Sequence, residues 1–182
     1  MSMAVRPEST VLTKGSGSPS EAFGGLALRI AGAMFMVGPA VIHFAVAPDQ
    51  LLVYPLYGIL FVLLGLIQIG LAIGIVVRPS PTLLLGGAGL SLAVIAVWLL
   101  SRTTGLPIAP VPWRREAVGL PDLFATYMEW AAAGLLVMAD FRLGTPRSFR
   151  VSRVAPGLTI AALLSVGMTV AGLAAVSSGG SH

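Results

Sequence analysis

Cysteine is absent from this chain of 182 residues. Its absence excludes disulfides, thiol catalysis, thiolate-bound zinc and iron–sulfur clusters, and it is compatible with either side of a membrane. Histidine is nearly absent too. His182 is the final residue, which leaves His43 as the one histidine inside an apolar run. A haem bound by two histidines is therefore not expected.

Charged residues are scarce as well. They make up 10% of the chain, against about 25% in soluble domains. Hydrophobic residues make up 56%, and the mean hydropathy is +0.93. Such a chain could not cover a water-facing surface, and no stretch between apolar runs is long enough for a soluble core. The composition predicts a single membrane domain.

The motifs of several enzyme and transporter classes are also missing. The chain contains no phosphate-binding glycine loop, no nucleophile elbow and no zinc-protease helix motif. No inverted repeat of the kind found in transporters is evident. The arginines are scattered among loops and form no basic stripe, so nucleic acid is not expected as a partner.

Apolar runs predict an all-α integral membrane bundle, because about twenty apolar residues cross the hydrocarbon layer. Five such runs are expected as transmembrane helices: 24–47, 54–77, 82–100, 121–140 and 155–176. Residues 1–23 are expected to be a flexible cytoplasmic tail, and 177–182 a second flexible tail. "AVA" at 45–47 resembles a signal-peptide end, but Pro48 would hinder cleavage, so retention of the first helix is expected.

Positive charges predict the orientation, because Lys and Arg are enriched on the cytoplasmic side. With the N-terminus inside and the C-terminus outside, the inner residues are Arg6, Lys14, Arg29, Arg78, Arg142, Arg147, Arg150 and Arg153, and the outer ones are Arg102, Arg114 and Arg115. This N-in/C-out topology places the link "PDQLL" outside. The expected location is a bacterial plasma membrane, with the lipid bilayer as the main partner.

Small and polar residues indicate the inward faces, because backbones approach closely where side chains are small. The expected inward residues are Arg29, Gly32, Met36, Pro39 and His43 in the first span; Tyr54, Gly58, Phe61, Gly65, Gln68 and Ala72 in the second; Gly86, Gly87, Gly89 and Ser91 in the third; and Asp122, Thr126, Glu129, Ala133, Leu136 and Asp140 in the fourth. Gln68 is interpreted as interhelical glue.

Depth in the membrane brings three of these polar residues together. Glu129 lies seven residues beyond Asp122, roughly 10 Å into the membrane, and His43 lies roughly 6 Å from its outer exit. The long side chain of Arg102 can reach inward. The expectation is that Arg102 neutralises Glu129, while His43 completes the hydrogen bonding or binds a ligand, beneath a semi-rigid, proline-rich loop at 101–121. The predicted pocket comprises His43, Tyr57, Trp98, Arg102, Asp122 and Glu129.

Alternatives stay open for the two central residues. Glu129 is either a functional group or half of a structural pair that sets helix register. His43 is a packing residue, a proton carrier or a metal ligand. A mononuclear metal site would use His43 and Glu129, with help from carboxylates or methionines, but no short motif specifies it. The cofactor is therefore unknown, with a metal as one option.

A resemblance follows from the order of these motifs. Five motifs follow one another within residues 26–140, in the order "IHFAVAP", "YPLYGILFVLLGLIQ", "VWLLSRTTGLP", "REAVGLPD" and "YMEW". In this the chain resembles an uncharacterised family of small multi-spanning membrane proteins, found mainly in actinobacteria. The relatives are expected to carry a second histidine where "PDQ" stands at 48–50. "ALRIAGAMFMVGPAVIHF" is also similar, more loosely, to DoxX-like four-helix bundles. The resemblance implies a motif-bearing outer face and no particular reaction.

The expected function is therefore non-enzymatic. The chain is interpreted as an accessory or ligand-binding subunit of a larger membrane or envelope assembly, with other membrane proteins as partners. The alternative is a small membrane enzyme or transporter that uses Glu129 and His43 as a proton relay or metal ligands.

Overall fold

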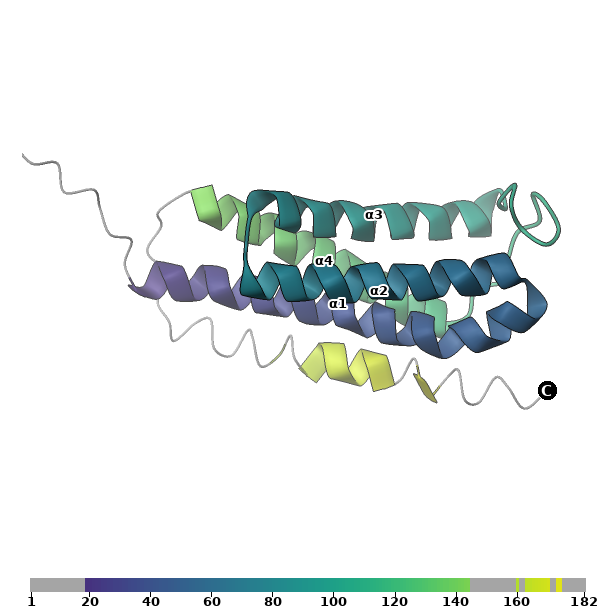
Figure 1. The fold of residues 1–182 in the computed structure, drawn as a ribbon, viewed down its shortest axis with the longest axis horizontal. Helices are drawn as coiled ribbons and strands as arrows, with labels where there is room; N and C mark the ends of the chain where they lie inside the picture. The colour runs from purple at the N-terminus through teal and green to yellow at the C-terminus, as the bar shows by residue number, and fades with distance from the viewer. Residues whose placement is uncertain (1–18, 145–159, 161–162, 171–172, 175–182) are drawn as a thin grey trace, which may run out of the picture.

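The structure is a computed structural model that describes residues 19–144, 160, 163–170 and 173–174. Four long helices account for most of it (Figure 1): α1 Pro19–Val53, α2 Pro55–Val77, α3 Pro81–Thr103 and α4 Leu120–Gly144. A fifth helical stretch covers 163–170, and the described residues contain no strand. The all-α prediction is confirmed. The predicted tail at 177–182, and residues 1–18 of the other tail, lie outside the described residues.

Among the described residues, three helices are long and apolar enough to cross a membrane. They are Gly24–Val53 of α1, the whole of α2 and the whole of α3. α4 has a similar length but carries Asp122, Glu129, Asp140 and Arg142. The chain therefore has the composition of a membrane protein, whereas the fourth and fifth spans stay predictions.

α1 extends further at both ends than the predicted first span. It begins at Pro19, inside the predicted tail, and continues through Pro39 and Pro48 to Val53. The predicted link "PDQLL" is thus helical, and Tyr54 alone joins α1 to α2. A proline inside a helix removes only one N–H, whereas ending the helix would expose several backbone groups that lipid cannot satisfy.

The four helices form an up-and-down bundle. α1 packs along α2 and α4, and α3 packs along α4, whereas α2 and α3 form the loosest of the four adjacent pairs. α2 and α4 are diagonal neighbours whose backbones do not approach each other closely. The core between the helices is apolar, and its largest fully buried members are Met36, Ile42, Ile75, Leu84, Met128 and Leu136.

Most of the predicted inward faces are confirmed. Gly58, Gly65, Gln68 and Ala72 are the buried residues predicted for α2. Gly32, Met36, Pro39 and His43 are buried in α1, and Glu129, Ala133 and Leu136 in α4. The other residues predicted to face inward in these spans are only half-buried: Arg29, Tyr54, Phe61, Asp122, Thr126 and Asp140. In α3 the prediction was half wrong: Gly87 and Ser91 are buried, but Gly86 and Gly89 are exposed. Two adjacent glycines point in different directions on a helix, so they cannot share a face.

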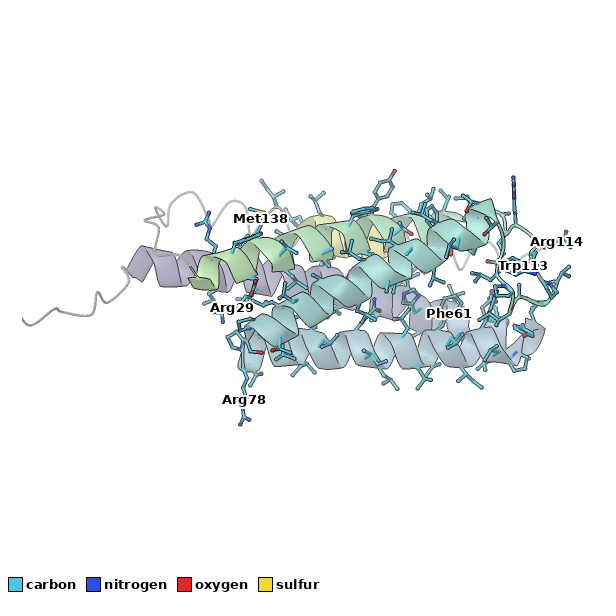
Figure 2. The ribbon with its side chains drawn as sticks, turned by 90° about the horizontal axis from the view of Figure 1, so that it is seen from above. Arg29, Phe61, Arg78, Trp113, Arg114 and Met138 are labelled. Carbon is cyan, nitrogen blue, oxygen red and sulfur yellow. The ribbon has the colours of Figure 1, made fainter. Side chains whose placement is uncertain are left out.

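The two ends of the bundle differ. At one end, Arg78 and Ser80 cap a tight turn, and the Ser80 hydroxyl accepts a hydrogen bond of 3.2 Å from the Leu83 N–H. The other end, called the loop end from here on, carries the α1–α2 turn and the α3–α4 loop at 104–119. Figure 2 shows Arg78 at the first end, and Trp113 and Arg114 at the loop end.

The α3–α4 loop folds back on the end of α3. The Glu116 N–H donates to the Ser101 carbonyl at 3.0 Å, and the Trp113 N–H donates to the Leu106 carbonyl at 3.1 Å. Gly105 has a φ of 79°, and a Cβ there would overlap the Trp113 carbonyl carbon. Only glycine fits that position, so this residue determines the path of the loop.

Replacing Gly65 by alanine is expected to loosen the α1–α2 contact. A Cβ there would lie 2.8 Å from the Phe44 ring and 3.2 Å from the Ala40 carbonyl oxygen. We expect Gly65→Ala to lower the free energy of unfolding by about 1–3 kcal/mol, the usual cost of overpacking. Thermal unfolding in detergent, followed by circular dichroism, measures the change. Gly70→Ala is the matched control on α2, because a Cβ at Gly70 meets nothing within 4 Å. Equal melting temperatures for the two variants would contradict this account of the packing.

Candidate functional site

Arg102, in the last turn of α3, holds two carboxylates at the loop end. Its Nη1 donates to Glu116 Oε2 at 2.7 Å, and its Nη2 donates to Asp122 Oδ2 at 2.5 Å. The arginine side chain is 12% exposed, and the side chains of Glu116 and Asp122 are 36% and 35% exposed. Asp122 also accepts a hydrogen bond of 3.2 Å from the Gly119 N–H at the start of α4, where a negative charge is favoured.

Aromatic side chains surround this arginine. The guanidinium carbon of Arg102 lies 5.9 Å from the centre of the Trp98 ring, within range of a cation–π interaction. The Tyr57 hydroxyl faces the Glu116 carboxylate, and Tyr54 packs edge-on against the Tyr57 ring at 5.2 Å. We call Tyr57, Trp98, Arg102, Glu116 and Asp122 the loop-end cluster.

Three polar atoms of the loop-end cluster are buried without a hydrogen bond of ordinary geometry among the described residues. They are the Tyr57 hydroxyl, Trp98 Nε1 and Arg102 Nε. The two nitrogens can only donate. Buried donors are nearly always paired with protein atoms, water or a ligand. The cluster therefore has unused capacity to bind acceptor oxygens.

His43 lies on α1, one side of its ring stacked on Phe61 of α2. The two ring centres are 5.3 Å apart and the planes differ by 14°. The residue is 7% exposed, and its Nε2 has no hydrogen-bond partner among the described residues. Figure 2 labels Phe61, which is nearer the loop end than the Arg78 end. His43 thus adds a fourth unpartnered group to the loop-end half of the bundle.

Glu129 belongs to a different cluster, in the middle of the bundle. Gln68 Nε2 of α2 donates to Glu129 Oε1 of α4, and the Ser91 hydroxyl of α3 faces the same carboxyl group. All three side chains are 0% exposed. Glu129 Oε2, Gln68 Oε1 and Ser91 Oγ have no hydrogen bond of ordinary geometry to any described residue. We call Gln68, Ser91 and Glu129 the deep cluster.

The structure divides the predicted pocket. Tyr57, Trp98, Arg102 and Asp122 lie together, whereas Glu129 lies deeper. The expectation that Arg102 neutralises Glu129 was wrong, because the guanidinium is taken by two carboxylates at its own end of the bundle. Among the described residues, His43 Nε2 has no partner, so it does not complete the hydrogen bonding of Glu129 or Arg102. Gln68 does act as interhelical glue, as predicted.

The residue patterns alone do not identify two members of these clusters, Glu116 and Ser91. Glu116 stood out only through the family resemblance, although it is the one acid in the loop between α3 and α4. Ser91 was placed on an inward face but was not linked to Glu129. Ser91 lies seven residues before Trp98, so the two side chains share one side of α3. That spacing is the sequence signal that could have identified Ser91.

The described residues hold no group of three or more His, Asp or Glu side chains that could hold a metal ion. His43 and Glu129 sit in separate environments, one stacked on a ring and one bonded to an amide. A metal bound by both would need a third ligand other than a described His, Asp or Glu side chain.

Replacing Arg102 by lysine is expected to destabilise the loop end. A lysine keeps the charge but loses the planar fork that binds Glu116 and Asp122 at once. We expect a loss of on the order of 1 kcal/mol, limited by the partial exposure of both carboxylates. Chemical denaturation in detergent measures it. Arg114→Lys, on an exposed residue of the same loop, is the control and should change nothing. A loss of the same size in both variants would show that the paired geometry is unimportant.

Comparison with known proteins adds no relative. No family model matches the chain, and neither a curated protein nor a solved structure matches it. The resemblance to the actinobacterial family and to DoxX-like bundles therefore stays a prediction.

Proposed function

We propose that this chain is a multi-pass protein of a bacterial plasma membrane that binds a ligand in the loop-end half of its bundle. It has five spans, with the N-terminus in the cytoplasm and the C-terminus outside. Its role is non-enzymatic, as an accessory or ligand-binding subunit of a larger membrane or envelope assembly. The loop end faces outward.

The surface of the bundle supports the membrane part of this proposal. α2 and α3 expose large apolar side chains along their whole length, from Leu56 and Leu100 at the loop end to Val77 and Leu85 at the other. α4 fits as a further span, because its other acids stand near its ends and Glu129 is turned inward. Lipid favours such an exterior, and water does not.

Buried polar groups without a hydrogen bond of ordinary geometry carry the binding part. Four such buried groups come from three helices: Trp98 Nε1, Arg102 Nε, the Tyr57 hydroxyl and His43 Nε2. Leaving such groups unsatisfied costs about 1–3 kcal/mol each. A ligand with several acceptor oxygens, either a small molecule or a lipid headgroup, would satisfy them. The aromatic rings of Tyr57, Phe61 and Trp98 suit a mainly apolar site with a few polar contacts.

Native mass spectrometry of protein extracted gently with its own lipids tests the binding proposal. We expect a defined extra mass on the wild-type chain. Tyr57→Phe and Trp98→Phe each remove one donor and keep a ring, so occupancy should fall about fivefold per lost hydrogen bond.

Tyr127→Phe is the matched control, because it removes the same hydroxyl from a side chain that is 63% exposed. It should leave the extra mass unchanged. A bare chain that travels with a second protein would make the protein a subunit whose loop-end cluster is purely structural. A bare chain alone would contradict both halves of the proposed role.

Cysteine labelling tests the orientation, since the chain has no cysteine that could react in the background. Val118→Cys replaces an exposed residue of the α3–α4 loop, and Pro79→Cys replaces an exposed residue of the α2–α3 turn at the other end. We expect a membrane-impermeant maleimide to label Val118→Cys on intact cells, and to label Pro79→Cys only after permeabilisation. The reverse pattern would invert the topology.

A further inference from the structure

Glu129 is a buried carboxyl group without a cationic partner among the described residues. It is 0% exposed, and Arg102 is occupied by Glu116 and Asp122 at the loop end. An uncompensated carboxylate inside a membrane is costly, so something must balance its charge. Either a proton or a bound cation can do so, and the surrounding atoms distinguish between them.

Oxygen atoms dominate these surroundings. Glu129 Oε2, Gln68 Oε1 and Ser91 Oγ are buried and have no hydrogen bond of ordinary geometry within the described part of the chain. They come from α4, α2 and α3, and both Gln68 and Ser91 approach the same carboxyl group. Carboxylate, amide and hydroxyl oxygens are the ligands that hard cations prefer. A proton on Glu129 Oε2 would serve only one acceptor such as Gln68 Oε1, whereas a cation would contact oxygens from all three helices at once.

α1 adds a backbone oxygen at a similar level. Pro39 is fully buried and has no N–H, so the carbonyl of Phe35 loses its donor within the helix. The neighbouring Gly38 lies against Met128, because a Cβ there would be 2.5 Å from the Met128 sulfur. Met128 directly precedes Glu129, and Phe35 lies roughly one turn away. The Phe35 carbonyl therefore lacks an intrahelical donor near the level of the deep cluster, although α1 stays helical through Pro39.

We propose that Gln68, Ser91 and Glu129 form a binding site for a monovalent cation of the sodium type in the middle of the bundle. One carboxylate balances one positive charge, and a divalent ion would leave an uncompensated charge in the interior. The site is distinct from the loop-end cluster, and its occupancy does not depend on a ligand there.

Thermal unfolding of the purified chain in detergent tests this site at constant pH and ionic strength. Sodium chloride replaces choline chloride stepwise, and the melting temperature is followed by tryptophan fluorescence. A cation that binds only the folded chain must raise the melting temperature with its concentration. We expect a saturable rise of a few degrees with sodium, and binding of radioactive sodium over the same concentration range.

Variants locate the ion. Glu129→Gln should abolish the sodium-dependent rise, whereas Glu116→Gln, which removes a carboxylate from the loop-end cluster, should preserve it. Ser91→Ala should shift the sodium titration to several-fold higher concentration. Ser101→Ala is its control, because that hydroxyl is already bonded to the Trp98 carbonyl. The serine pair keeps the test decisive if Glu129→Gln does not fold.

Three results would overturn the proposal. The first is a wild-type chain that responds equally to sodium and choline and binds no radioactive sodium, which would leave a proton to balance Glu129. The second is sodium binding that survives in Glu129→Gln. The third is an identical titration for Ser91→Ala and Ser101→Ala. Tyr57→Phe should leave the sodium response intact, so loss of the loop-end ligand and loss of the ion are separate outcomes.

Discussion

The hydrogen bond from Gln68 to Glu129 crosses the centre of the bundle and joins two helices whose backbones do not approach each other closely. α2 and α4 stand on opposite corners, so this bond is a diagonal tie between them. In lipid such a tie has no competition from bulk water, and helix association depends on close packing and on bonds of this kind. The inward direction of α4, and with it the position of Asp122 at the loop end, follows from burying Glu129 at this point.

The polar groups therefore lie at two depths, which differ in how far water and salt reach them. In the loop-end cluster, charges are paired and the carboxylates are about a third exposed, so water and salt reach them. In the deep cluster, all side chains are sealed, and each atom must find its partner inside the protein. The first arrangement suits a ligand that arrives from outside. The second suits one small occupant that stays within the fold.

Much of this architecture could be predicted from the sequence, because apolar length and helical periodicity are local properties. The faces that hold Gln68 and Glu129 followed from spacing alone. The continuation of α1 through Pro48 could not be predicted in this way. A proline occurs both where a helix ends and inside a helix that tolerates the loss of one backbone hydrogen bond. The partner of Arg102 could not be inferred either. It depends on the path of the α3–α4 loop, which is set by the positive φ angles of Gly105 and Trp113. Helical spacing carries no information about how such a loop returns Glu116 to Ser101.

Tyr54 has a mechanical consequence. Two helices joined through one residue cannot slide past each other, so α1 and α2 behave as a single rigid hairpin. α3 is held more loosely, by a short turn at one end and by a long loop at the other, and it packs least against α2 among its adjacent helices. The α2–α3 seam is therefore the side of the bundle where the least packing would have to be broken. A molecule that entered there would pass between the apolar side chains of α2 and α3 and not through the loop end.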